Sequence, residues 1–153
     1  MDNRYKIGRA DESFVEELAL LEKKCFENDP WSKQMFADLI KNDNCITMYI
    51  CDMQMSKMIG YSVICIAYDQ ADLANIAVLP EYRRNGIGQI LLEETFKKCV
   101  GSGVLELFLE VRESNVPAIS LYKKNQFVEI GKRRNYYTRP REDAVVMMKT
   151  LEG

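Results

Sequence analysis

Residues 80–96 read PEYRRNGIGQILLEETF: a proline, two arginines and two glycines, followed at once by an apolar run with helical spacing. Ile87, Leu91, Leu92 and Phe96 recur every three or four residues, which predicts a helix from about Gly86. Flexible and positively charged residues directly before a helix have two explanations. Either the helix start happens to be rich in glycine, or an anion binds there.

The local charges favour the anion site. A helix N-terminus has free N–H groups and carries about half a positive charge, and Arg83 and Arg84 add full charges. Gly86 and Gly88 remove side chains where a ligand would approach the backbone. A P-loop would need Gly-Lys-Ser/Thr, and a dinucleotide fingerprint would place a third glycine or alanine at Leu91. Neither motif is present, so the strand, proline turn, R-x-x-G-x-G and helix predict a pyrophosphate site of another kind.

Ten further segments have the period of a helix or of a strand. Helices are expected over 13–26, 29–40 and 115–125, and strands over 5–10, 45–52, 57–68, 71–79, 104–111, 127–137 and 143–151. The order is therefore β-α-α-β-β-β-α-β-α-β-β. The central strand–helix–strand passage implies parallel neighbours and the hairpins imply antiparallel ones. We expect an α/β fold with a mixed sheet and helices on its faces.

Three polar residues are placed to cap these helices. Ser13 and Glu16 have the spacing of a capping box for the first helix. Ser32 is expected to cap the second helix, and Asn115 the last one, which has Pro117 in its first turn.

The composition is that of one folded domain over residues 1–153, with 47% apolar and 29% charged residues. A net charge of −2 gives no general attraction to nucleic acid or acidic membranes. No stretch approaches the roughly 20 apolar residues of a membrane span, and the start of the chain lacks the apolar core of a signal peptide. We therefore expect a cytoplasmic protein without a nucleic-acid or membrane partner. The sequence leaves the oligomeric state open and is compatible with a monomer.

Two residue types limit the chemistry. The absence of histidine removes Ser–His and Cys–His nucleophilic devices and most zinc sites, so no metal is expected. Five cysteines, an odd number without a C-x-x-C pair, have apolar neighbours. They are expected to be reduced and to pack as small apolar side chains; they are Cys25, Cys45, Cys51, Cys65 and Cys99.

The R-x-x-G-x-G motif at the start of the helix after the fourth strand resembles the GNAT family of acetyl-CoA-dependent N-acyltransferases, and the element order extends the resemblance over nearly the whole chain. It implies a single-domain GNAT fold, in which two neighbouring parallel strands in the middle of a mostly antiparallel sheet splay apart and acetyl-CoA lies in the gap. It also implies main-chain contacts to the acetyl and pantetheine arm from Ile76, Ala77 and Val78. The diphosphate would be held by Arg83, Arg84, Asn85, Gly86, Ile87 and Gly88.

The motifs LEVR-x-SN-x-x-AI-x-LY, RRNYY, EDAVVM and DPWS resemble the branch of this family that acetylates the N-terminal alanine of the eighteenth small-subunit ribosomal protein. That resemblance implies that Glu110 is the proton acceptor, Tyr122 the proton donor to departing CoA, and Asn115 a CoA contact. By spacing alone, a glutamate at a strand end is more often solvated and Tyr122 more often part of the core.

The resemblance also implies walls for a peptide channel. Tyr136 and Tyr137 of the last hairpin would form one wall, and the segment around Pro30 and Trp31 the other. The basic residues of the hairpin are better explained by a solvated hairpin than by a nucleic-acid site, and Trp31 is equally suited to be a packing anchor.

The ordinary pKa of a peptide α-amine is about 8 and that of a lysine amine about 10.4, so deprotonating lysine at neutral pH costs roughly 3 kcal/mol more. Without histidine, a carboxylate base suits the N-terminal amine better. Two alternatives stay open: an acetyltransferase with a broader protein N-terminal, lysine, polyamine or small-amine acceptor, and a non-catalytic CoA-binding module.

Overall fold

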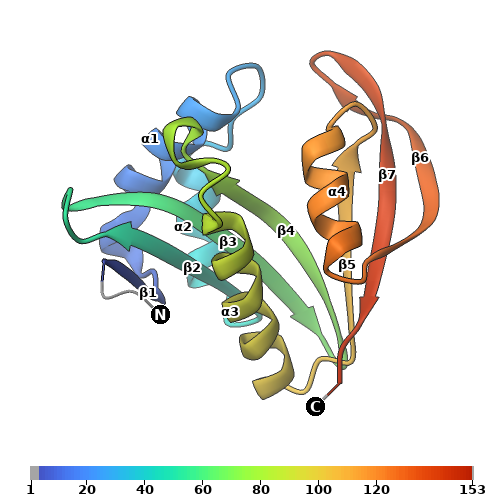
Figure 1. Ribbon diagram of the computed structural model, residues 1–153, viewed down its shortest axis with the longest axis horizontal. Helices are drawn as coiled ribbons and strands as arrows, with labels where there is room; N and C mark the ends of the chain where they lie inside the picture. The colour runs from blue at the N-terminus through green and yellow to red at the C-terminus, as the bar shows by residue number, and fades with distance from the viewer. Residues whose placement is uncertain (1–3, 153) are drawn as a thin grey trace.

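The structure, a computed structural model, describes residues 4–152 and has the predicted order of elements (Figure 1). The helices are α1 (Val15–Cys25), α2 (Lys33–Lys41), α3 (Ile87–Gly101) and α4 (Val116–Lys124). The strands are β1 (Tyr5–Arg9), β2 (Cys45–Asp52), β3 (Lys57–Ala67), β4 (Gln70–Val78), β5 (Glu106–Arg112), β6 (Val128–Thr138) and β7 (Arg141–Thr150). They form one seven-stranded sheet in the order β1-β2-β3-β4-β5-β7-β6.

Helices cover both faces of this sheet, as predicted. On β3 the Tyr61 hydroxyl donates to Glu22 of α1, and the Tyr61 ring lies 5.4 Å from that of Phe36 of α2. The next residue, Ser62, is hydrogen-bonded to Thr95 of α3. Because successive side chains of a strand point to opposite faces, α1 and α2 lie on one face and α3 on the other. Figure 1 shows α4 beside β5 and β7, on the side of α3.

β4 and β5 are the parallel pair, and they pair only at their first residues, where Gln70–Asp72 face Glu106–Phe108. The two strands then diverge, as Figure 1 shows. A register shift between β3 and β4 leaves Ala74 as an extra residue, since Val63 faces Asn75 and Ile64 faces Leu73. Such a bulge bends a strand. The predicted splayed pair is confirmed.

The caps agree with the sequence at two helices and differ at one. The side chains of Ser32 and Asn115 accept hydrogen bonds from backbone N–H groups of α2 and α4, as expected. The capping box at Ser13 is wrong. Residues 12–14 form a separate 3-10 turn capped by Asp11, whose carboxylate accepts the Ser13 N–H at 2.9 Å, and α1 begins only at Val15.

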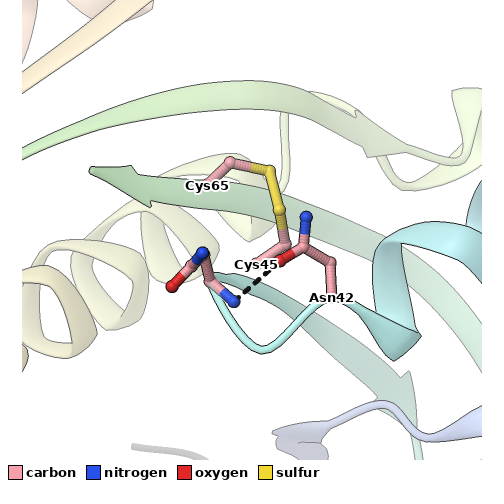
Figure 2. The surroundings of a disulfide bond; sticks show 4 residues. Asn42, Cys45 and Cys65 are labelled. Carbon is pink, nitrogen blue, oxygen red and sulfur yellow. Dashed lines mark hydrogen bonds between the residues drawn. A yellow bond between two sulfur atoms is a disulfide. The ribbon is translucent and has the colours of Figure 1, made fainter.

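The expectation of five reduced cysteines is also wrong. Cys45 of β2 and Cys65 of β3 form a disulfide (Figure 2). Antiparallel pairing places them directly opposite each other, with Cα atoms 4.1 Å apart, and such close Cα atoms are typical of a non-hydrogen-bonded pair. Cys25, Cys51 and Cys99 are free.

No helix within residues 4–152 is long and apolar enough to cross a membrane.

Candidate active site

The loop between β4 and α3 presents an uninterrupted row of free backbone donors. Within the described chain, no acceptor is bonded to the N–H groups of residues 84–88. Arg84 and Gly86 both have left-handed backbone conformations, with φ of 67° and 78°. These two conformations determine the path of the loop. Residue 87 then begins α3. Free N–H groups before a helix bind anions, so the loop fits the predicted diphosphate site.

The two glycines of this loop serve different purposes. A Cβ atom at Gly86 would meet nothing within 4 Å, so the requirement there is the positive φ, which glycine adopts without strain. A Cβ atom at Gly88 would lie 3.3 Å from Cδ2 of Leu121. Gly88 therefore allows α4 to pack closely against the start of α3.

The two arginines also differ. Arg83 Nε donates to the Val78 carbonyl at 3.1 Å, so this side chain lies back over the end of β4. The Cys25 thiol donates to the same carbonyl at 3.4 Å. Arg84 is exposed beside the free N–H groups. The Arg84 side chain thus lies at the loop, whereas the Arg83 side chain is bonded to the strand that leads into it.

The predicted pantetheine-contacting residues, Ile76, Ala77 and Val78, follow the bulge of β4 and pair with β3 alone. They lie where β5 has already separated from β4, before the loop that leads to α3. One of their backbone donors is occupied, since the Ile76 N–H donates to the Asn75 side chain at 3.0 Å.

Glu110 and Tyr122 lie on β5 and α4, without a hydrogen bond between them in the described structure. Glu110 is one quarter exposed and forms an ion pair with Arg133, with 3.8 Å between Oε1 and Nε. Tyr122 is buried against Phe127, and burial raises the pKa of its hydroxyl well above the usual value. Tyr122 is therefore protonated at neutral pH and is a weaker acid than an exposed tyrosine.

Tyr137 connects this region to the last hairpin. Burial raises its pKa to about 12, and its hydroxyl interacts electrostatically with both Glu110 and Tyr122. The ring of exposed Tyr136 meets that of Tyr137 edge-on at 5.0 Å. The guanidinium of Arg112, two residues after Glu110 on the same face of β5, lies 4.3 Å from the Tyr137 ring centroid.

A backbone irregularity of β6 lies at these two tyrosines. The pairing of β6 with β7 shifts between Arg133 and Tyr137. Within the shifted segment Asn135 has a φ of 52°, and its N–H donates to the Asp143 carboxylate at 2.8 Å. The basic residues Arg112 and Arg133 contact tyrosine rings and acidic groups of this region.

The remaining predicted residues have structural contacts of their own. Asn115 Oδ1 accepts the Ala118 N–H at 3.2 Å, which leaves the amide NH₂ group of Asn115 for a ligand. Trp31 is half-buried, with its ring 5.5 Å from that of Phe36 in an edge-on arrangement. Its backbone N–H donates to Glu22 at 2.8 Å.

The comparisons with known proteins identify the family. Residues 15–127 match the Acetyltransferase (GNAT) family. The chain belongs to this family. Over 120 residues it is 41% identical to the [Ribosomal protein bS18]-alanine N-acetyltransferase of Escherichia coli K12, covering 77% of this chain and 79% of that one. The Haemophilus influenzae enzyme of the same name is 40% identical over 121 residues, or 77% and 80% of the two chains.

Solved structures of GNAT proteins agree with this fold. The crystal structure of the ribosomal-protein-S18-alanine N-acetyltransferase from Escherichia coli matches with a TM-score of 0.88 and 34% identity, covering 97% of this chain and 95% of that one. The PaiA N-acetyltransferase of Thermoplasma acidophilum, solved in complex with coenzyme A, shares the fold with a TM-score of 0.81 and 21% identity over 98% and 99% of the chains.

Sequence reasoning missed two groups that shape this GNAT site. Arg112 holds the hairpin, and nothing in the spacing of LEVR marks it. Glu22 is 1% exposed and accepts hydrogen bonds from Trp31, Tyr61 and Asn75. The sequence could have predicted that Glu22 is buried, because it follows Leu18 by one helical turn and so falls on the apolar face of α1.

Proposed function

We propose that this protein transfers the acetyl group of acetyl-CoA to the α-amine of the N-terminal alanine of ribosomal protein bS18. The reaction type rests on one observation: the row of free N–H groups at 84–88, which begins just after the strand that splays away from β5. The acceptor rests on the likeness to the bS18-alanine N-acetyltransferases. A ribosomal acceptor places the reaction in the cytoplasm, with residues 1–153 acting as one domain.

We assign the residue roles from the likeness to GNAT proteins and from the positions of the residues in the fold. The N–H groups of residues 84–88, with Arg84 beside them, bind the diphosphate, and the main chain of residues 76–78 holds the pantetheine arm. Acetyl-CoA supplies the thioester carbonyl that the amine attacks. Glu110 accepts the proton of the amine, directly or through water. Tyr122, the residue in the position of the family's proton donor, donates a proton to the departing thiolate.

The acceptor channel lies between two walls in this proposal. Tyr136 and Tyr137 of the hairpin form one, and Trp31 forms the other. Glu110 forms an ion pair with Arg133, with 3.8 Å between Oε1 and Nε. An incoming ammonium group competes for the same carboxylate, so Arg133 marks where the acceptor's positive charge is received before its proton is removed.

Three acceptors distinguish the candidate functions. The protein is incubated with acetyl-CoA and an alanine-initiated bS18 peptide, the same peptide with a blocked N-terminus and a free lysine, or spermidine, and the products are mapped by tandem mass spectrometry. We expect acetyl only on the α-amine. Acetylation of the lysine or of spermidine alone would show the alternative acceptor class. Binding of acetyl-CoA without any product would show a non-catalytic module.

The base is tested by Glu110→Gln. We expect turnover to fall by about 10²–10⁴-fold, as for loss of a general base, with acetyl-CoA affinity nearly unchanged in calorimetry. Glu106→Gln is the matched control, because Glu106 lies on the same face of β5 and forms only an exposed hydrogen bond with Gln70. Simultaneous loss of acetyl-CoA binding and activity in Glu110→Gln would contradict the assigned role.

A further inference from the structure

Glu22 is a buried carboxylate that the proposed reaction does not use. Its side chain on α1 is 1% exposed, and burial raises its pKa above the usual carboxyl value. No cation pairs with it within residues 4–152. A buried acidic group without a cationic partner is costly, so its surroundings indicate what it stabilises.

Each partner of Glu22 comes from a different segment. Oε2 accepts the N–H of Trp31, in the loop between α1 and α2, at 2.8 Å. Oε1 accepts the Tyr61 hydroxyl of β3 and the Asn75 side-chain amide of β4, the latter at 3.0 Å. Asn75 in turn accepts the Ile76 N–H at 3.0 Å. Glu22 therefore joins one predicted wall of the acceptor channel to the strand that holds acetyl-CoA.

Aromatic contacts connect the same segments. The ring of Trp31 lies 5.5 Å from that of Phe36, and Phe36 lies 5.4 Å from Tyr61, both edge-on. The loop of residues 26–32 has no regular backbone hydrogen bonding before Ser32 apart from the helix end at Phe26. The contacts of Trp31 thus fix the position of this loop relative to β3 and β4.

We propose that Glu22 is a positioning residue: its two carboxylate oxygens hold the loop of residues 26–32, at Trp31, in a fixed position relative to β4, at Asn75. The proposal rests on the proposed function for its acceptor and cofactor. A glutamine can accept at one oxygen only. If that oxygen keeps Tyr61 and Asn75, the NH₂ group faces the Trp31 N–H, so two donors oppose each other and the loop is released.

Two variants separate the two ends of this connection. Glu22→Gln is expected to raise the KM for the alanine peptide about tenfold, the effect of one lost buried hydrogen bond, with little change in acetyl-CoA affinity. Asn75→Ala removes the partner of the Ile76 N–H and is expected to weaken acetyl-CoA binding instead. Trp31 is the sole tryptophan, so acrylamide quenching of its fluorescence reports the loop directly and should increase in Glu22→Gln.

Ser62→Ala is the matched control, because it removes a buried hydrogen bond to Thr95 from the opposite face of the same strand as Tyr61. It should leave Trp31 quenching and both KM values as in the wild type. The proposal would be overturned if Glu22→Gln had the Trp31 quenching and the peptide KM of the wild type. It would also be overturned if the affinities for both substrates fell equally, together with the thermal stability. If the wild type acetylates no acceptor, the proposed function fails, and Trp31 quenching alone decides the role of Glu22. If Glu22→Gln does not fold, Tyr61→Phe with the same readouts decides it.

Discussion

At the scale of single residues, the backbone at Gly86 matters more than the space around it. Its φ of 78° sets the direction of the loop before α3, and a Cβ atom there would have no neighbour within 4 Å among residues 4–152. A residue with a Cβ pays a steric cost in that conformation, of about 1 kcal/mol. The cost falls on the loop that we propose to bind the diphosphate.

We therefore expect Gly86→Ala to lower the free energy of unfolding by about 1 kcal/mol and to weaken acetyl-CoA binding. Urea denaturation and calorimetric titration measure the two effects. Gly101→Ala is the control, since Gly101 ends α3 without a positive φ and a Cβ there would also meet nothing within 4 Å. Equal behaviour of the two variants would show that the conformation at 86 does not matter.

Single residues also show where the sequence is least informative. G-x-G before a helix indicates a turn and free N–H groups, but not that Arg83 turns back to Val78 while Arg84 remains at the loop. The position of Arg83 depends on the path of the backbone from Val78 to Arg83, which the motif does not specify. The positive φ of Arg84 has no sequence signal either, because arginine rarely adopts it.

At the scale of elements, Arg112 fastens the last hairpin to β5. Its guanidinium donates to the carbonyls of Pro140 at 3.0 Å and Arg139 at 3.1 Å, contacts Glu142 at 3.2 Å, and covers the Tyr137 ring. A planar group with five donors can make all of these contacts at once. The hairpin tyrosines are thus held in place from the strand that carries Glu110.

Arg112→Ala should raise the KM for the alanine peptide several-fold, because one channel wall loses its anchor, while acetyl-CoA affinity stays near the wild-type value. Steady-state kinetics with each substrate varied in turn measures both. Lys132→Ala serves as control, since its ion pair with Glu113 is about half exposed and such pairs are worth about 0–1 kcal/mol. An unchanged peptide KM in Arg112→Ala would contradict the anchoring role.

A second anchor precedes the loop of residues 84–88. Tyr82 donates to Asp52 at 2.5 Å, and Arg4 donates to both oxygens of the same buried carboxylate. These bonds hold the pKa of Asp52 well below its usual value. Because the pKa is lowered in the folded state, this contribution to stability is present above the ordinary aspartate pKa of about 3.9 and is lost as the pH falls below it.

We expect the urea midpoint of the wild type to fall more steeply below about pH 4 than that of Asp52→Asn, which has no carboxylate to protonate at this position. Denaturation curves at pH 7, 5, 4 and 3 measure the difference. Parallel pH profiles for the two proteins would show that Asp52 does not contribute in this way.

Elements are the scale at which the sequence predicts best. Period and caps predict every helix and strand, although β6 is exposed along nearly its whole length and β2 is buried on both faces. The capping box at Ser13 is an exception, because the Asp11 carboxylate accepts the Ser13 N–H and hydroxyl and the α-helix begins only at Val15. The bulges at Ala74 and around Asn135 leave no such pattern, because one or two extra residues change the period only locally.

At the scale of the whole molecule, the sheet brings together residues that are distant in sequence. β5 lies between β4 and β7, so the loop after β4, Glu110 and the hairpin tyrosines share one region. The same long-range pairing explains the incorrect cysteine expectation. Cys45 and Cys65 become neighbours only through the register of β2 and β3, which spacing alone does not fix.

The disulfide closes a loop with a sequence separation of 20 residues, for which chain entropy gives about 3 kcal/mol of stabilisation. Reduction should lower the free energy of unfolding by about this amount in urea denaturation. The Cys45→Ala/Cys65→Ala protein should not respond to the reductant. Five reactive thiols in the unreduced, denatured protein would instead show that the bond does not form.

The account depends most on the position of acetyl-CoA, and a crystal structure of the complex tests it most directly. We predict the diphosphate within hydrogen-bond distance of the N–H groups at 84–88, and the thioester carbonyl between β4 and β5 beside Glu110. A diphosphate bound elsewhere, with these N–H groups bonded within the chain, would contradict the account.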